Sequence, residues 1–286
     1  MEHFVKGDYF NYIKLPVFFK EDEITKNVQK LFDGASKIVK DYDESKNTLW
    51  ILRHYLAAKM ILASTVLLTS SEYSRRKNIR ISEPYMIYYS LLSCSRAVVF
   101  TNPNITIKGD LFTMTHQKTI NMIGDILSHY NKQKSEEIES YIEFARIYRE
   151  NFSYRYPANG MKDFPDLKLD KVIDICSLLC EVAQIQSAVI ENKISKINTG
   201  SFKLQVEDMK HAFMYGEGHL QVFDDEDFYR INYIDRKVHC PLSIYNTMTE
   251  GLVEDFFGSW CSSEEEYEIE DCYDPDKNWR IIFPVP

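Results

Sequence analysis

The sequence lacks the short motifs that most directly indicate an enzyme class. Its 286 residues contain no phosphate-binding Walker loop, no paired Cys motifs at zinc-ligand spacing and no Gly-x-Ser-x-Gly elbow. A P-loop ATPase, a structural zinc site and an α/β-hydrolase nucleophile therefore have no support in the sequence. No metal site and no cofactor are expected.

Targeting and membrane signals are also missing from the sequence. Residues 1–4 do not show the basic region followed by an apolar region that marks a secretory signal. The most apolar stretch, residues 49–68, includes Arg53, His54 and Lys59, so it is not expected to cross a membrane. These features predict a soluble, cytoplasmic protein.

The cysteines fit a reducing compartment. Cys176 and Cys180, two of the six, lie one helical turn apart within an apolar run. A single pair at this spacing indicates buried thiols rather than a metal site. Reduced thiols in a cytosol are therefore expected.

Negative charge exceeds positive charge, with a formal net charge of -9 and a sequence pI near 5.4. An acidic chain is not expected to coat nucleic acid nonspecifically. The acidic residues concentrate at residues 224–227 and 264–271, whereas residues 75–80 are basic and leave local RNA contact open. Four consecutive acids could bind a divalent cation, but a solvated turn is the preferred interpretation.

Apolar residues recur in steps of three and four through the first two thirds of the chain, which predicts successive amphipathic helices. Six are expected, over about residues 24–38, 49–67, 85–100, 115–130, 138–152 and 169–197. The third helix begins with Ser82 as a capping hydroxyl and Pro84 in its first turn. Because this helix is apolar nearly all round, it is expected at the centre of the bundle. Thr115 is expected to cap the fourth helix.

The hydrophobic period changes near residue 199. Alternating segments at residues 201–206, 219–223 and 228–234 predict short strands, with residues 224–227 as a hairpin turn. A short helix is expected within residues 241–257 and a last strand at 279–283. The predicted fold is therefore α+β but mainly α: an antiparallel helical bundle over residues 1–198, then a small mixed α/β C-terminal region over residues 199–286.

Four segments, in order along the chain, resemble the core helices of the HEPN superfamily. They share the family's two adjacent aromatics, its Arg-Ala pair, its His followed closely by Lys, and its Arg-containing last helix. The matching segments are residues 55–59, 88–97, 115–120 and 144–156. The resemblance covers about residues 50–157, and residues 83–85, which lead into the aromatic pair, resemble the YaaC-like branch.

The resemblance implies a homodimeric helical bundle that cleaves RNA without a metal. In active members, an Arg is followed four to six residues later by a His, and two copies of this pair face each other across the dimer, where a 2′-hydroxyl attacks the adjacent phosphate. The imidazole can exchange a proton near neutral pH. The guanidinium can bind the phosphorane charge in bidentate geometry.

The matching segment of this chain departs from that pattern. Arg149 and Asn151 are present, but Tyr154 stands where the family has His, and no arginine in the chain is followed by His at that spacing. A tyrosine with a pKa of about 10 is a weak base at pH 7, although it can donate a hydrogen bond. Arg149, Asn151 and Tyr154 are therefore the catalytic candidates for an RNase activity that is absent or unconventional. The alternative is a solvated arginine and a packed tyrosine.

Arg96, His116 and Lys118 are candidates for phosphate binding. Arg96 is the only formal charge within residues 85–100. Because an unpaired buried cation is costly, Arg96 should reach an acidic partner or face a pocket or a dimer seam. His116 is expected at a helix start, which favours an anion, although a plain capping or surface histidine is the preferred interpretation. If Arg96, His116 and Arg149 converge, they form a phosphate-binding cluster.

Two classes of function follow from these features. The first is a HEPN-like protein of a bacterial defence or toxin–antitoxin system, which binds RNA or a partner protein such as an antitoxin and forms a homodimer. The second is a non-catalytic interaction subunit, whose acidic and aromatic C-terminal region docks onto a larger ATPase or effector. A small-molecule or nucleotide-binding regulator is a third hypothesis, which depends only on convergence of Arg96, His116 and Arg149.

Overall fold

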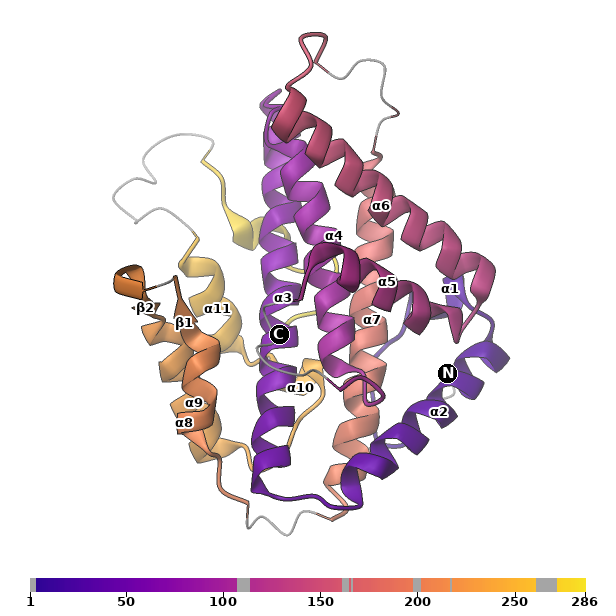
Figure 1. Ribbon diagram of the computed structural model, residues 1–286, viewed down its shortest axis with the longest axis vertical. Helices are drawn as coiled ribbons and strands as arrows, with labels where there is room; N and C mark the ends of the chain where they lie inside the picture. Colours follow the sequence, from indigo (N-terminus) through magenta and orange to yellow (C-terminus); the bar gives the residue numbers. More distant parts are fainter. Residues whose placement is uncertain are drawn as a thin grey trace.

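The computed structural model describes residues 4–106, 114–160, 165, 167–197, 202–216, 218–260 and 272–286. Nearly all regular structure in these residues is helical, and the mainly helical α+β class and the helical bundle are confirmed (Figure 1). The helices are α1 (Leu15–Phe18), α2 (Glu21–Val39), α3 (Glu44–Arg76), α4 (Glu83–Thr101), α5 (His116–Ser128), α6 (Lys132–Arg155), α7 (Leu169–Ile194), α8 (Val206–Lys210), α9 (Asp225–Lys237), α10 (Ile244–Thr247) and α11 (Glu250–Gly258). Two short strands, β1 (Met214–Tyr215) and β2 (Val222–Phe223), pair antiparallel.

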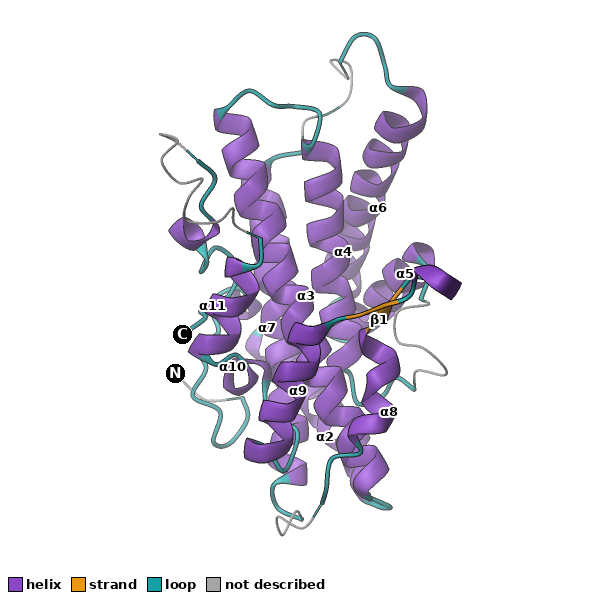
Figure 2. Cartoon of the chain, turned by 90° about the vertical axis from the view of Figure 1, so that its left-hand side faces the viewer, coloured by secondary structure: helices purple, strands orange, loops and turns teal. Residues whose placement is uncertain are grey.

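The helix α4 lies at the centre of the bundle, as its composition predicts. It packs against α3 along most of its length, and α7, α6 and α5 cover its other sides. Figure 2 shows the roughly parallel axes of α3, α4 and α7. The helix α2 packs on α7 at the periphery of the bundle. These contacts place α5 and α6 together over one side of α4.

The helices α3 and α7 are also buried over much of their surface. Every residue from 50 to 58 and from 175 to 190 is buried, because α3 and α7 contact neighbouring elements on several sides. Both are long and apolar enough to span a bilayer, but their most apolar windows are 72% and 89% buried inside the fold. A helix that is buried on several sides within a bundle needs an apolar composition of this kind.

Side-chain caps define where several helices begin. Asp43, Thr115, Asn131 and Asp224 each accept a hydrogen bond from a backbone N–H of the following first turn. Thr115 caps α5 as predicted. Ser82 does not cap α4 through its side chain, because its hydroxyl donates to Ser74 Oγ at 3.3 Å.

A buried arginine holds the C-terminal end of α4 against α3. Arg53 is 3% exposed, and its guanidinium carbon lies 3.9 Å from the centre of the Trp50 ring. The guanidinium donates to the backbone carbonyls of Val99, Phe100, Asn102 and Ile105. Carbonyl groups at a helix end have no intrahelical partner. Arg53 therefore supplies hydrogen bonds to carbonyls that would otherwise be buried without one.

The prediction for the C-terminal region is wrong in its local structure. Residues 224–227 are not a hairpin turn, because Asp224 caps α9 and the following acids form its first turn. The expected strand at residues 228–234 lies within α9, and residues 279–283 form turns and bends. The expected helix within residues 241–257 is two helices, α10 and α11. Carboxylates in a first turn stabilise a helix through its dipole, which favours α9 over a strand.

The C-terminal region packs on the bundle. The helices α8, α10 and α11 contact α3, and α10 also contacts α7. The buried side chains of Ile231, Ile244 and Phe257 join the same apolar cluster as the bundle core. The acidic run at residues 264–271 lies outside the described residues.

The cysteines in the core are reduced and buried. Cys94, Cys176 and Cys180 are free thiols with 0% exposure, which confirms the prediction of buried thiols for the last two. Burial is the largest cause that raises the pKa of each of these three thiols. A thiol in this state is a poor nucleophile and a poor metal ligand.

Candidate phosphate-binding site

Two adjacent tyrosines of α4 form a platform where α5 and α6 cover that helix. Tyr88 is 0% exposed and Tyr89 is half-buried. Their ring centroids lie 5.3 Å apart at an angle of 62°. Because the two residues are consecutive in α4, the rings point in different directions and face both covering helices.

A cation from α6 and an imidazole from α5 contact this platform. The guanidinium carbon of Arg149 lies 5.1 Å from the centre of the Tyr88 ring and 5.9 Å from that of Tyr89. The ring of His116 lies 5.6 Å and 5.9 Å from the same two centroids. Cation–π attraction to the tyrosine faces stabilises Arg149 in a buried position.

Arg96 completes the cluster from α4. Tyr89 and Arg96 are seven residues apart, which places them on the same face of an α-helix. The Nη2 atom of Arg96 donates to the Met114 carbonyl at 3.4 Å, directly before α5. The positive charges of Arg96 and Arg149 both act on His116. Arg96, His116 and Arg149, which are far apart in the sequence, thus lie around Tyr88 and Tyr89.

This cluster contains several buried donors with no partner in the described part of the chain. They are the hydroxyl of Tyr88, the Nε–H of Arg96 and the Nε–H of Arg149. Buried polar groups in native proteins are rarely left without a hydrogen bond. Three unsatisfied donors in one cluster, two of them on guanidinium groups, favour a ligand that carries negative charge and several acceptor oxygens.

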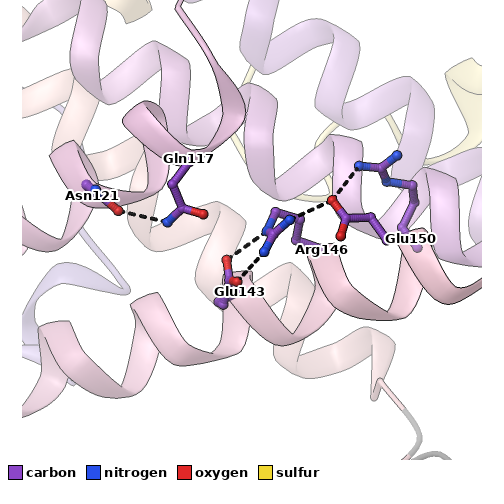
Figure 3. A network of polar contacts seen from close by, with 6 residues as sticks. Gln117, Asn121, Glu143, Arg146 and Glu150 are labelled. Atoms are coloured by element: carbon purple, nitrogen blue, oxygen red, sulfur yellow. Dashed lines mark hydrogen bonds and ion pairs between the residues drawn. The ribbon is translucent and has the colours of Figure 1, made fainter.

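Acidic residues of α6 partly compensate the positive charge. Arg146 lies between Glu143 and Glu150, with its Nη1 atom 2.6 Å from Glu150 Oε1 and its Nε atom 2.9 Å from Glu143 Oε2 (Figure 3). The same Glu150 oxygen is 3.5 Å from the Nη2 atom of Arg149. On the facing helix α5, Gln117 donates to Asn121 at 2.9 Å. Arg146 is therefore satisfied by two carboxylates, whereas Arg149 retains an unsatisfied donor.

The electrostatic environment keeps His116 neutral. Burial is the largest cause that lowers the pKa of His116, and the charges of Arg96 and Arg149 lower it further. Burial also raises the pKa of Tyr88 to about 12, although Arg149 opposes that change. At pH 7 the cluster therefore presents two guanidinium groups, a neutral imidazole and an intact phenol.

Arg149 and Tyr154 do not meet within the chain. Arg149 is 9% exposed and faces α4, whereas Tyr154 is 82% exposed. Five residues correspond to about 140° of rotation around a helix, so the two side chains leave α6 in different directions. Asn151 is half-buried, and Lys118 has an exposed side chain. The structure thus brings together Arg96, His116 and Arg149 but leaves Tyr154 outside their cluster.

Two features of the site were not anticipated from the sequence. The first is the role of Tyr88 and Tyr89 as the surface on which His116 and Arg149 pack, which no local pattern reveals. The second is the carboxylate pair at Glu143 and Glu150. Their spacing of three and four residues from Arg146 is the usual spacing of helical ion pairs, so the sequence does contain that signal.

A metal site has no comparable support in the structure. Across the described ranges, no group of three or more His, Cys, Asp or Glu side chains is placed to hold a metal ion. Comparison with known proteins gives no match to a family model, a curated protein or a solved structure.

Proposed function

We propose that this chain binds RNA through the seam between α4, α5 and α6, as a HEPN-like protein of a bacterial defence or toxin–antitoxin system, without RNase activity of the usual kind. The observation that carries the proposal is the convergence of Arg96, His116 and Arg149 on the Tyr88–Tyr89 platform, with the Nε–H groups of both arginines unsatisfied. A phosphate offers the charge and the acceptor oxygens that these donors require.

Features beside the seam support a single-stranded nucleic acid as the ligand. Tyr85, at the start of α4, packs edge-on against Phe152 of α6, and Phe152 packs against Tyr156 at 5.2 Å between centroids. Tyr85 and Tyr156 are 37% and 63% exposed. Proteins usually bind unpaired bases by stacking them on exposed aromatic rings that lie next to cationic side chains.

Basic residues lie at the same end of α4. Three of them are exposed: Arg76 at the end of α3, and Lys77 and Arg80 in the segment that joins α3 to α4. Arg75 of α3 instead pairs with Glu83 and donates to the Leu167 carbonyl at 2.9 Å. The local positive charge can thus attract a polyanion although the whole chain is acidic.

The missing histidine and the position of Tyr154 support the absence of an ordinary RNase reaction. A general base must lie within hydrogen-bond reach of the hydroxyl it activates, and Tyr154 projects away from Arg149. His116 is neutral and close to the platform, but it lies on α5 rather than at the family position. We therefore expect binding to depend on Arg149 and cleavage to be absent.

The test is an RNA-binding titration by fluorescence anisotropy, with parallel incubation of the protein with tRNA and total RNA. Arg149→Ala should weaken binding about 10- to 100-fold, since hydrogen bonds to charged groups contribute roughly 1.5–3 kcal/mol. The matched control is Arg236→Ala, which removes an exposed arginine of α9. If Arg149→Ala and Arg236→Ala bound RNA with equal affinity, the proposed site would be refuted. Cleavage that disappears in Arg149→Ala would instead make the seam catalytic.

A partner protein is the second candidate ligand, and the expected homodimer remains a prediction. Exposed apolar side chains favour this candidate: Ile79 and Ile81 are 44% and 50% exposed beside the start of α4, and Tyr154 is 82% exposed. Side chains of this kind are enriched in protein interfaces. A stable partner that co-purifies from the native host, with no RNA affinity of the free protein, would favour this function over RNA binding.

A further inference from the structure

We propose a second ligand site, for an organic cation with an apolar body, in a cleft between α3 and the C-terminal region. The cleft has a volume of about 690 Å³ and is lined by side chains of α3, β1, α9 and α11. In Figure 1, α11 and β1 lie on the opposite side of α3 from α5 and α6, so this cleft is separate from the phosphate-binding site. Its size is in the range of small-molecule sites.

The floor of the cleft is a buried polar network around Asp227. One carboxylate oxygen of Asp227 accepts from the Tyr55 hydroxyl at 2.6 Å, and the other bonds to Lys59 Nζ and to the Tyr215 hydroxyl, at 3.1 Å for the latter. The side chains of Lys59 and Asp227 are 13% and 4% exposed. The ammonium group of Lys59 is therefore already neutralised and is not available to bind an anionic ligand.

The second cation in the lining is also paired. Arg230 of α9 forms an ion pair with Asp255 of α11 and donates to the Gly251 carbonyl at 2.6 Å. The titratable lining residues besides tyrosine comprise four carboxylates and two cations. Since Lys59 and Arg230 compensate Asp227 and Asp255, Asp224 and Glu226 have no cationic partner among the lining residues. The Asp224 side chain accepts the Asp227 N–H, as the cap of α9.

The rest of the lining is apolar or aromatic. Met60 and Ala63 of α3 and Phe256 of α11 line the cleft, together with Tyr215 and Trp260. Tyr215 and Trp260 are 45% and 62% exposed. Aromatic faces next to carboxylates attract a cation and disfavour an anion of the same shape. The apolar lining selects a cation that carries a hydrocarbon or aromatic body.

The test compares two probes with the same aromatic body and opposite charge, phenethylammonium and 3-phenylpropanoate, by isothermal titration calorimetry on the full chain. We expect saturable binding of phenethylammonium and binding of 3-phenylpropanoate that is about tenfold or more weaker, because like charges repel at the cleft. No heat with phenethylammonium, or equal affinity for both probes, would overturn the proposal.

Variants locate the bound cation. Asp224→Asn with Glu226→Gln should weaken phenethylammonium binding while retaining a capping oxygen at the start of α9. Trp260→Ala should weaken it about two- to fivefold, the usual contribution of an exposed cation–π contact. The matched control, Glu207→Gln with Asp235→Asn, removes the same number of negative charges from exposed positions elsewhere.

Two further results distinguish binding in the cleft from binding at the phosphate site and from a general attraction to the acidic chain. Arg149→Ala, in the phosphate-binding site, should bind phenethylammonium as the wild type does. Equal weakening by the control pair and by the cleft pair would show that net charge alone attracts the probe, which would also overturn the proposal. Circular dichroism and the melting temperature of each variant check that it is folded.

Discussion

Acidification should destabilise this protein through His54, which the core keeps neutral. His54 lies on α3 with 1% exposure, and its Nδ1 atom is 2.6 Å from the Leu242 carbonyl. Since a carbonyl only accepts, Nδ1 carries the hydrogen, and Nε2 has no partner in the described part of the chain. Burial, with a smaller contribution from the charge of Arg53, lowers the pKa of His54 to about 3.

The direction and size of the effect follow from this lowered pKa. Below pH 6.5, the ordinary pKa of histidine, the unfolded chain takes up a proton at this position that the folded chain excludes. The stability contributed by neutral His54 is therefore complete above pH 6.5 and is lost progressively as the pH falls toward 3. At pH 5 the loss is about 2 kcal/mol, a large fraction of a typical stability of about 5–15 kcal/mol.

The assay is urea unfolding of the wild type and His54→Asn at pH 7 and at pH 5. The Asn amide can still donate to the Leu242 carbonyl, but it does not titrate, so only the change between the two pH values is compared. The wild type should lose about 2 kcal/mol more than the variant. His129→Asn, which replaces an exposed histidine, should behave as the wild type. If the wild type and His54→Asn lost the same stability, the proton-linked role of His54 would be refuted.

Three further predictions concern groups with defined contacts. Arg53→Met should lower the free energy of unfolding by about 3 kcal/mol or more, measured in urea, because four carbonyls at the end of α4 lose their donor. Asp227→Asn should cost about 3–5 kcal/mol in the same measurement, because Lys59 stays buried without its counter-charge; a loss well below 1 kcal/mol would contradict either account. RNA affinity should rise as the pH falls from 7 to 5, because a bound phosphate raises the pKa of His116 and favours its protonation; His116→Asn should lack this slope in an anisotropy titration.

The bundle could be predicted from the sequence because each helix has its own local signals. The apolar period of three to four residues, the capping Thr115 and the proline in the first turn of α4 are all local, and the corresponding helices occur where they were expected. The continuous apolar composition of residues 85–100 also predicted the central position of α4. Burial on several sides requires a helix to be apolar all round, so composition and position are linked.

The C-terminal region could not be predicted as well, because its short apolar segments fit two periods. Phe228, Ile231 and Ile234 follow a helical spacing of three, yet residues 228–234 also alternate as a strand would. Tertiary contacts decide between the two, since Ile231 is fully buried within α9. The cap at Asp224 and the acids after it favoured the helix, because the helix dipole stabilises carboxylates in a first turn.

The candidate site shows the same division between local and tertiary information. The sequence singled out Arg96, His116 and Arg149 by residue type and by their places on expected helices. It could not show that all three approach Tyr88 and Tyr89, since that depends on how α5 and α6 cross α4. Nor could it show that Arg149 is buried while Tyr154 is exposed.

The separation of Arg149 from Tyr154 assigns different surfaces to the two residues. Arg149 packs on Tyr88 inside the chain, where it can bind a phosphate that enters the seam but has little surface left for a second protomer. Tyr154 projects to solvent, where it can contact a partner but cannot act on a phosphate held by Arg149 of the same chain. A metal-free RNase needs base and phosphate-binding group in one place. The RNA binding that we propose would therefore use the face of α6 that carries Arg149, and the partner contact that we propose would use the face that carries Tyr154.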